Sequence, residues 1–247
     1  MLILLPPSES KAAGGGALTL DRVALTFGTL NPARDAVRRA YEALHPGSDV
    51  LNAPTMPAID RYKGTLFGAI HGRGLKGSGT ENNLLGTVER ERAKDLLFVQ
   101  SALFGLIPAT GLIPNYKLSA GASLPGLLSP VSGERATLRA VWAEGHESVW
   151  RRLAESGPII DLRSRAYADL APIPAGVEHF WVEVLDSASG KALNHFNKKS
   201  KGELVRAVLQ ATTAPASLGD LADVASSIGL RLKLDEVAQG RLLLLAR

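Results

Sequence analysis

The highest local density of positive charge in the chain lies between residues 195 and 206. Four lysine and arginine side chains accompany one glutamate, Glu203, in this segment. We expect a strand to end near Phe196 and a helix capped by Ser200, with Glu203 completing a capping box. Free N–H groups at a helix start, combined with lysine charge, are the ingredients of a phosphate site. The alternative is a solvated basic turn. The candidate ligand-binding residues here are His195, Asn197, Lys198, Lys199, Lys201 and Arg206.

A second candidate segment follows the short apolar run that ends at Asp161. Arg163 and Arg165 offer guanidinium groups for phosphate, and Tyr167 offers a ring on which a base could stack. Ser164 adds a hydroxyl. The alternative is an ordinary loop in which an arginine pairs with Asp161.

The sequence gives little support to covalent or metal chemistry. None of the serines lies in a G-x-S-x-G elbow, and the five histidines form no H-x-x-x-H or H-x-H pair. The absence of cysteine excludes disulfides, thiolate zinc sites and Fe–S clusters. Gly72, Gly74 and Gly77 match a dinucleotide fingerprint by letter only, because no apolar helix and no acidic ribose ligand follow. We expect a flexible basic loop over residues 61–80. We also expect no metal, no cofactor and no identifiable catalytic residue.

The candidate residues follow predicted strands. Met1–Leu5 reads as a buried strand that Pro6 and Pro7 stop, so the polar turn Ser8–Lys11 comes directly after it. The apolar stretch 97–121 predicts a buried strand, a short helix, a tight turn around Pro108–Gly111 and a second apolar segment ending near Pro114. A plain core crossing is the alternative for this stretch. Tyr116 and Lys117 follow it.

Helices and strands alternate along the rest of the chain. We expect helices over 31–44, 80–94, 132–154, 200–209 and 217–228, a strand pair over 180–185 and 191–196, and a terminal hairpin of 230–234 with 242–245. This order predicts a mixed α/β fold, a central mixed sheet surrounded by helices, in one domain spanning residues 1–247.

Composition allows nucleic-acid binding without requiring it. The 247 residues carry a formal charge of +4, and the sequence pI is about 9.4. The opening apolar run is too short for a signal peptide, and no run approaches the roughly 20 residues that span a bilayer. We expect a soluble, cytoplasmic protein with no membrane partner.

An ordered set of motifs resembles the YaaA family of peroxide stress proteins. They are MLILLPPSESK at the start, YKG at 62–64, SALFGLI at 101–107, PNYKL at 114–118, the IDL strand at 160–162 with Ser164 and Tyr167, and NKKSKG at 197–202. The resemblance implies the fold called "cantaloupe", with a helix-hairpin-helix-like element that we place within Ala102–Pro114. It also implies a role in lowering intracellular iron and oxidative damage under hydrogen peroxide, and DNA binding through a basic cleft.

We therefore expect a protein that binds double-stranded DNA without sequence preference, its cleft lined by turns at strand ends. The remaining cleft residues are Lys11, Arg61, Lys63 and Lys117, with Ser8, Tyr116, Ser164 and Asn197 as candidate pocket residues. The rival is an enzyme acting on a small phosphorylated or carboxylated metabolite, with Ser8, Lys11, Tyr116, Ser164 and Lys199 as its polar groups. A third class is a protein-interaction module with an exposed apolar patch. The sequence indicates no oligomeric state.

Overall fold

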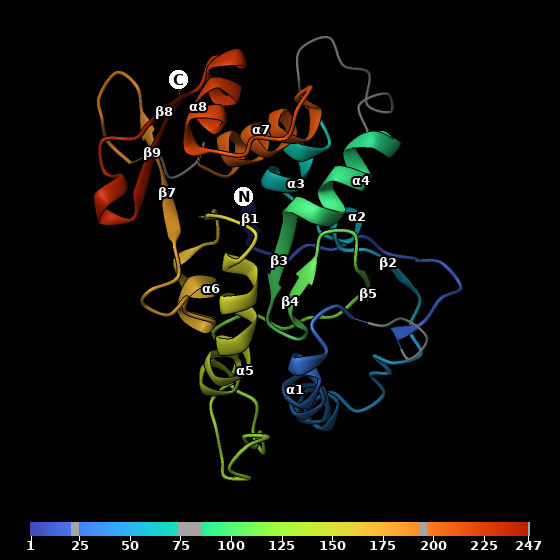
Figure 1. The fold of residues 1–247 in the computed structure, drawn as a ribbon. Helices are drawn as coiled ribbons and strands as arrows, with labels where there is room; N and C mark the ends of the chain where they lie inside the picture. Colours follow the sequence, from blue (N-terminus) through green and yellow to red (C-terminus); the bar gives the residue numbers. More distant parts are fainter. Residues whose placement is uncertain (21–24, 74–84, 193–196, 247) are drawn as a thin grey trace.

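The computed structural model describes residues 1–20, 25–73, 85–192 and 197–246. A seven-stranded mixed sheet lies between two layers of helices (Figure 1), which confirms the predicted mixed α/β class. Along the sheet the strand order is β4-β3-β1-β6-β7-β9-β8. The strands are β1 (Leu2–Leu5), β3 (Leu97–Ser101), β4 (Gly105–Pro108), β6 (Ile159–Asp161), β7 (His179–Asp186), β8 (Arg231–Lys233) and β9 (Arg241–Ala246).

The five inner strands are parallel, and one antiparallel strand closes each edge. β1 occupies the interior, with Leu4 in register with Phe98 of β3 on one side and with Asp161 of β6 on the other. All four β1 residues are buried, as expected where helices cover both faces of a parallel sheet. The continuous apolar run at the start of the sequence is therefore a central strand.

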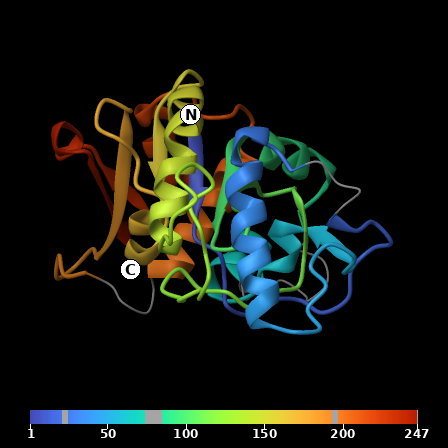
Figure 2. The ribbon, with the colours of Figure 1, turned by 90° about the horizontal axis from the view of Figure 1, so that it is seen from below.

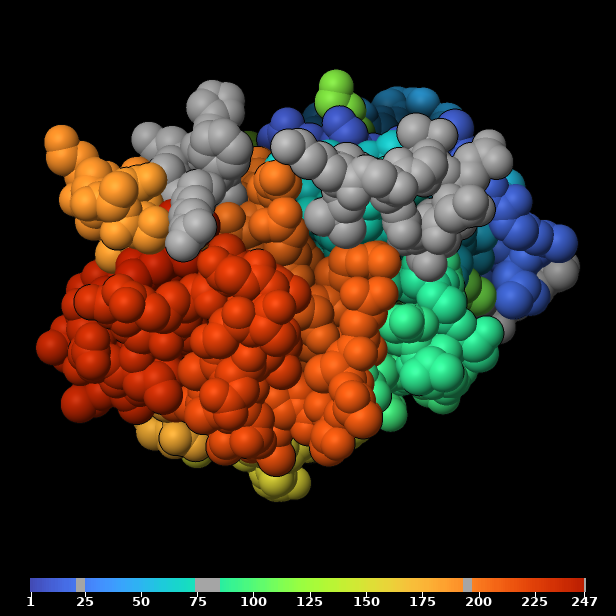
Figure 3. All heavy atoms as spheres, turned by 90° about the horizontal axis from the view of Figure 1, so that it is seen from above, coloured from blue at the N-terminus to red at the C-terminus, as the bar shows by residue number. Residues whose placement is uncertain are grey.

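Helices cover both faces of the sheet. One layer holds α1 (Asn31–Leu44), α5 (Leu138–Ala154) and α6 (Arg165–Leu170), and Figure 2 shows α1 and α5 side by side. The other holds α3 (Thr65–Ile70), α4 (Thr87–Leu96), α7 (Asn197–Gln210) and α8 (Leu218–Ser227). Seen from above, the atoms of α7 and α8 form a broad face with α4 beside them (Figure 3).

Smaller elements lie at the margin of this sandwich. β2 (Thr55–Pro57) pairs antiparallel with β5 (Leu112–Pro114), and α2 (Ala58–Arg61) follows β2 directly. Two short 3-10 helices, η2 (Gly28–Leu30) and η3 (Val237–Gln239), precede α1 and β9.

The segment Ala102–Pro114 differs from expectation, because it contains strands and no helix. The predicted short helix and the helix-hairpin-helix-like element placed there are both wrong. Ser101 Oγ accepts hydrogen bonds from the backbone N–H groups of Leu103 and Phe104, which turns the chain sharply into β4. Gly105 has φ +65°, and a Cβ there would lie 2.6 Å from the ring of Trp142. The turn at Pro108–Gly111 and the end at Pro114 are confirmed.

Other expectations hold in part. The helix over 31–44, the strand over 180–185, the helix begun by Ser217 and the terminal hairpin are confirmed. The predicted start of the helix at Ser200 is wrong, because α7 begins at Asn197 and Ser200 is buried within it. α5 begins at Leu138 rather than near 132, and residues 65–70 form α3 rather than a loop. Residues 74–84 and 193–196 of the predicted elements, including His195, lie outside the described residues.

Candidate functional site

The site begins at the point where the chain changes direction across the sheet. After β1 the chain continues to β3 on one side, and after β6 it continues to β7 on the other. In open α/β sheets, such a switch point opens a crevice at the carboxyl ends of the two adjoining strands. The turns that leave β1 and β6 carry Ser8–Lys11 and Arg163–Tyr167.

A cavity of about 470 Å³ occupies this switch point, and we call it the switch-point cavity. Its walls come from the turn after β1, the start of α3, the 119–121 segment, the start of α6 and the first turn of α7. Five of the predicted site residues line it: Ser8, Lys63, Ser164, Tyr167 and Lys198. Residues far apart in the sequence therefore converge here as predicted.

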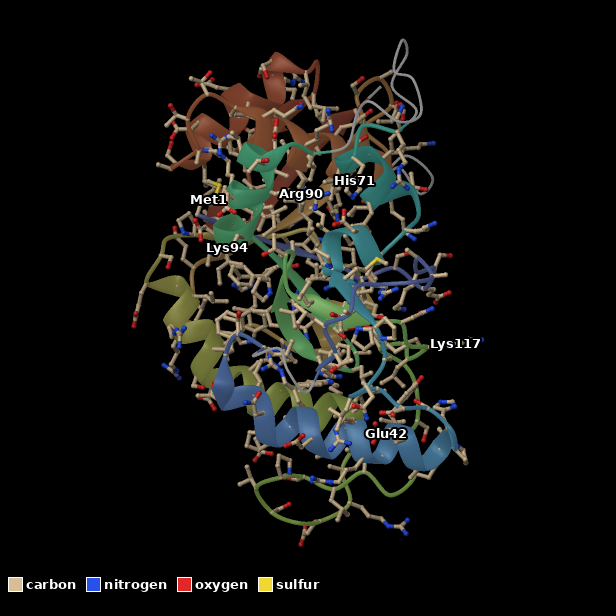
Figure 4. All side chains as sticks on the ribbon, turned by 90° about the vertical axis from the view of Figure 1, so that its right-hand side faces the viewer. Met1, Glu42, His71, Arg90, Lys94 and Lys117 are labelled. Atoms are coloured by element: carbon tan, nitrogen blue, oxygen red, sulfur yellow. The ribbon has the colours of Figure 1, made fainter. Side chains whose placement is uncertain are left out.

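A second, larger cavity of about 840 Å³ adjoins the first, and we call it the outer cavity. Glu9 and Ser119 line both cavities, which are therefore neighbours, and we call the two cavities together the furrow. Lys11, Tyr116 and Lys117 are the predicted residues in its wall. Lys117 is exposed and lies at the margin of the molecule in Figure 4.

Two predicted phosphate ligands are buried structural cations instead. The guanidinium of Arg61 donates to the carbonyl oxygens of Ala12, Gly14, Pro54 and Ile113, and none of the residue is exposed. It therefore holds together the segments beside β2 and β5. Neither cavity includes Arg61 in its lining, so its placement in the cleft is not supported.

Arg163 is the second buried cation, and only 1% of it is exposed. Its Nη2 lies 2.7 Å from Asp161 Oδ2, its Nε lies 3.0 Å from Asp161 Oδ1, and its guanidinium stacks over Trp150. The alternative left open by the sequence, an arginine paired with Asp161, is what the structure contains. Arg163 does not line the furrow.

Four further predicted cations lie outside the lining of both cavities. Lys201 is buried and donates to the Leu162 carbonyl, and burial lowers its pKa to about 8. Lys199 pairs with Glu203 at 3.6 Å. Arg206 donates to the Ile70 carbonyl at 3.0 Å, and Arg165 stacks over Trp181. Asn197, half-buried at the start of α7, is also absent from the cavity walls.

A buried chain of hydroxyl groups lies beneath the furrow. Tyr116 OH is 2.6 Å from Tyr62 OH and 2.8 Å from Ser101 Oγ. Burial raises the pKa of both tyrosines well above the usual range, so both phenols are neutral at physiological pH. These hydrogen bonds between hydroxyl groups fix the Tyr116 ring in the wall of the outer cavity.

Lys11 lies on this aromatic surface. Its Nζ is 4.3 Å from the centre of the Tyr116 ring and 5.5 Å from that of Tyr62, and it donates to the Ser8 carbonyl at 3.1 Å. Burial lowers the pKa of Lys11 to about 8; the Glu9 carboxylate opposes this shift, and the Arg61 guanidinium adds to it. A fraction of this amine is therefore unprotonated near neutral pH.

Tyr167 contributes its phenol to the switch-point cavity. Its hydroxyl is hydrogen-bonded to the backbone of Ala120, and burial raises its pKa to about 12. The Tyr167 phenol is therefore a neutral hydrogen-bonding group in the cavity wall rather than an anion.

Sequence reasoning missed several residues of the furrow: Glu9, His45, Gly64, Thr65 and Ser119. Gly64 carried a usable signal, since a glycine between two polar residues often marks positive φ. Its φ is +100°, and a Cβ there would lie 3.1 Å from Ser8 Oγ. The backbone of α3 can therefore start close to the turn after β1. His45 and Ser119 carried no comparable signal.

The described part of the chain contains neither a metal-binding cluster nor a membrane-spanning helix. No group of three or more His, Cys, Asp or Glu side chains there could hold a metal ion. No helix among those residues has both the length and the apolar character needed to cross a bilayer.

Comparison with known proteins decides the family. Residues 19–234 match the family described as "Peroxide stress protein YaaA". The chain belongs to the YaaA family of peroxide stress proteins. The resemblance seen in the ordered motifs is therefore confirmed.

Curated relatives of this YaaA family member bear the name UPF0246 protein. One from Corynebacterium efficiens is 33% identical over 96% of each chain. One from Corynebacterium glutamicum is 34% identical over 93% of this chain and 94% of its own. One from Streptomyces coelicolor is 32% identical over 97% of this chain and 95% of its own. The similarity thus extends over nearly the full length of each protein.

Proposed function

We propose that this YaaA family protein binds double-stranded DNA in the cytoplasm, by its phosphates and without sequence preference, along the furrow. The observation that supports this most directly is the charge of the furrow wall. Lys63, Lys117 and Lys198 are exposed in this wall, Lys11 is half-buried in it, and Glu9 is the single carboxylate of the lining. Lysine binds phosphate as a point charge and reads no base, so contacts of this kind position a backbone.

The first turn of α7 strengthens the attraction for phosphate. Lys198 is exposed one residue after the helix begins at Asn197, and the helix is 14 residues long. The partial positive charge of a helix N-terminus adds to the lysine charge at this point. Tyr167, across the cavity, offers an aromatic ring beside the phosphate path.

A salt titration tests the proposal. Binding of a fluorescent 20-base-pair duplex is measured by anisotropy between 50 and 200 mM salt. With the three exposed lysines each contacting one phosphate, we expect log K to fall with log salt with a slope of about −3. Several unrelated sequences are expected to give the same affinity. A flat response, or no binding at 50 mM salt, would overturn the proposal.

A matched pair of double variants locates the contacts. Lys63→Ala with Lys198→Ala removes two furrow lysines, and we expect the slope to become shallower by about 2. Lys94→Ala with Arg139→Ala removes the same charge from exposed positions outside both cavities, on α4 and α5. If both pairs weaken binding equally, net charge rather than the furrow explains the affinity.

The rival function, an enzyme acting on a small phosphorylated metabolite, is supported by the position of the switch-point cavity. Open α/β sheets bind small ligands there, and about 470 Å³ suits one. Of its predicted polar groups, Lys199 does not line the furrow. Saturable binding of a sugar phosphate that DNA fails to displace would favour this function.

We extend the proposal to the family role in limiting intracellular iron and oxidative damage. DNA binding supports that role by placing the protein on a molecule that peroxide damages. The proposal assigns no iron-binding residue to this role.

A further inference from the structure

The feature that the proposed function leaves unused is the amine of Lys11. DNA phosphates require lysines that are charged and exposed, as Lys63, Lys117 and Lys198 are. Lys11 differs from these three, since it lies half-buried against two tyrosine rings. Its position calls for an explanation other than charge.

The surroundings of Lys11 make its amine easier to deprotonate than that of an exposed lysine. The rings of Tyr116 and Tyr62 replace water on one side, and this desolvation outweighs the support that the ammonium receives from the backbone carbonyls of Ser8 and Glu9. Among the ion pairs of the described residues, none includes Lys11. Burial lowers its pKa to about 8. A desolvated lysine of this kind is an activated nucleophile toward carbonyl carbon.

The titratable and charged groups around Lys11 come from four parts of the chain. Glu9 on its own turn stabilises the ammonium, and Arg61 at the end of α2 destabilises it. Lys117 and His45 line the same cavity from the segment after β5 and the end of α1. With both phenols neutral, Glu9 is the one carboxylate in the lining of the outer cavity.

Access distinguishes Lys11 from the other lysine with a lowered pKa. Lys201 has a pKa of about 8 too, yet it is only 5% exposed and lines neither cavity. Lys11 lies in the wall of the outer cavity, whose volume of about 840 Å³ accommodates a sugar phosphate. A ligand can therefore reach the Lys11 amine.

We propose that Lys11 captures the aldehyde of an abasic nucleotide in bound DNA as an imine. The inference rests on the proposed function, which supplies the ligand chemistry: a strand held by its phosphates brings its sugars into the outer cavity. An abasic sugar opens to an aldehyde and lacks the base that would otherwise fill this space. A free sugar phosphate has the same aldehyde chemistry and is the other source of such a ligand.

The step balances without an added oxidant or reductant. The lone pair of neutral Nζ forms a bond to the aldehyde carbon as the C=O π bond breaks, and a proton moves from that nitrogen to the oxygen. The hydroxyl of the carbinolamine takes up a second proton from solvent and leaves as water, and the nitrogen lone pair forms the C=N bond of a protonated imine between Lys11 and the sugar. Borohydride added in the test delivers hydride to the imine carbon and makes the link permanent.

Trapping with borohydride tests the inference on the full-length protein. The protein is incubated with a duplex containing one abasic site, reduced, and digested for mass spectrometry. We expect one adduct, on Lys11, and no adduct with the intact duplex. Adducts spread over exposed lysines, an adduct on the Met1 amine, or none at all would overturn the inference.

Two variants of equal charge separate chemistry from binding. Lys11→Arg keeps the cation over the Tyr116 ring but cannot form an imine, and we expect trapping to fall at least about tenfold. Lys94→Arg, at an exposed position on α4 outside both cavities, is expected to trap as the wild type does. Thermal unfolding of both variants checks that they fold, and adduct mapping in the wild-type protein needs no variant.

The pH dependence provides a second readout. The neutral share of an amine with a pKa of about 8 rises about fivefold between pH 7 and pH 8, so we expect initial trapping to rise by that factor. A trapping rate that does not change over this range contradicts a Lys11 nucleophile.

Failure of the inference is distinguishable from failure of the proposed function. Salt-dependent binding of the abasic duplex with no trapping would overturn the inference and leave DNA binding standing. Trapping at Lys11 by free ribose 5-phosphate, with no duplex bound at 50 mM salt, would overturn DNA as the carrier and as the proposed partner.

Discussion

Arg61 and Arg163 have a structural role in this protein, whereas the furrow lysines are available to bind a ligand. Arg61 and Arg163 are enclosed and satisfied by carbonyls or by Asp161, whereas Lys63 and Lys198 are exposed in a cavity wall. Arginine suits the first task because its planar guanidinium can donate in several directions at once. Lysine suits the second because its charge remains hydrated and mobile.

His146 is a residue whose titration affects the whole fold. It is fully buried, its Nδ1–H donates to the Trp142 carbonyl at 2.7 Å, and its Nε2 accepts from the Leu106 N–H at 3.0 Å. The contact with Leu106 requires the neutral ring, because a protonated Nε2 cannot accept a hydrogen bond. Burial, the largest cause, lowers the pKa of His146 to about 3.

We expect stability to fall on acidification because of His146. Between pH 6.5 and the folded-state pKa, the unfolded chain binds a proton that the folded protein does not, so the free energy of unfolding decreases as pH falls. From pH 6.5 to pH 5 this amounts to about 2 kcal/mol. Urea unfolding of the wild type and of His146→Gln at both pH values measures the difference.

A control accompanies this measurement. Burial lowers the pKa of His71 as well, so the variant is expected to retain part of the acid sensitivity. An equal loss of stability in wild type and variant would show that His146 contributes none of it.

At the scale of elements, the contact between α3 and α7 positions one side of the switch-point cavity. A Cβ at Gly202 would lie 2.4 Å from the Leu66 carbonyl oxygen and 2.7 Å from the Ala69 Cβ. The two helices therefore approach as closely as they do because position 202 lacks a side chain. Asp60 also ties α2 to α4, because it pairs with Arg90 at 2.8 Å, and it lies 3.5 Å from His71 at the end of α3.

We expect Gly202→Ala to push α3 away from α7. The predicted cost is about 1–3 kcal/mol of unfolding free energy, with weaker DNA binding, because the start of α3 forms part of the cavity wall. Thermal or urea unfolding and the anisotropy titration measure the two effects.

Gly68→Ala, on α3 itself, is the matched control. A Cβ there meets nothing within 4 Å, so we expect a neutral effect or a gain of up to about 1 kcal/mol. If Gly202→Ala is as well tolerated as Gly68→Ala, the close helix contact does not determine the cavity.

The positions of the strands could be predicted from the sequence, whereas the burial of the side chains that follow them could not. Apolar runs such as Leu2–Leu5 identify a central strand, and the turns after it and after Asp161 were correctly expected to converge. Charge alone did not reveal that Arg163 is buried, because its partner Asp161 lies only two residues away and either state was possible. The wrong prediction for Ala102–Pro114 had a similar cause. Position 105 needs a glycine because a Cβ there would collide with Trp142, which lies on α5, far along the sequence.

At the scale of the whole molecule, the central strands of the sheet have more hydrogen-bonded neighbours than the edge strands. β1 is paired on both sides, whereas β4 and β8 are edge strands with one partner each. Backbone groups in the middle of such a sheet open only when the packing around them is lost. The furrow lies at the end of the best-supported strands.

We expect hydrogen exchange to follow this order. Amides of Ile3–Leu5 are predicted to be among the slowest and to report global unfolding, whereas those of β8 at Arg231–Lys233 exchange faster. Native-state exchange followed by mass spectrometry measures both. Rapid exchange in β1 under native conditions would show that the centre of the sheet opens independently.

The central position of β1 also determines when the sheet can form during synthesis. β1 acquires its two neighbouring strands only after Leu97 and then Ile160 have been synthesised. Until then an apolar tetrapeptide is exposed, with both of its edges available to chaperones or to other nascent chains. The lining of the switch-point cavity is complete only once Lys198 has been synthesised. A chain truncated before Lys198 would therefore lack part of the furrow wall.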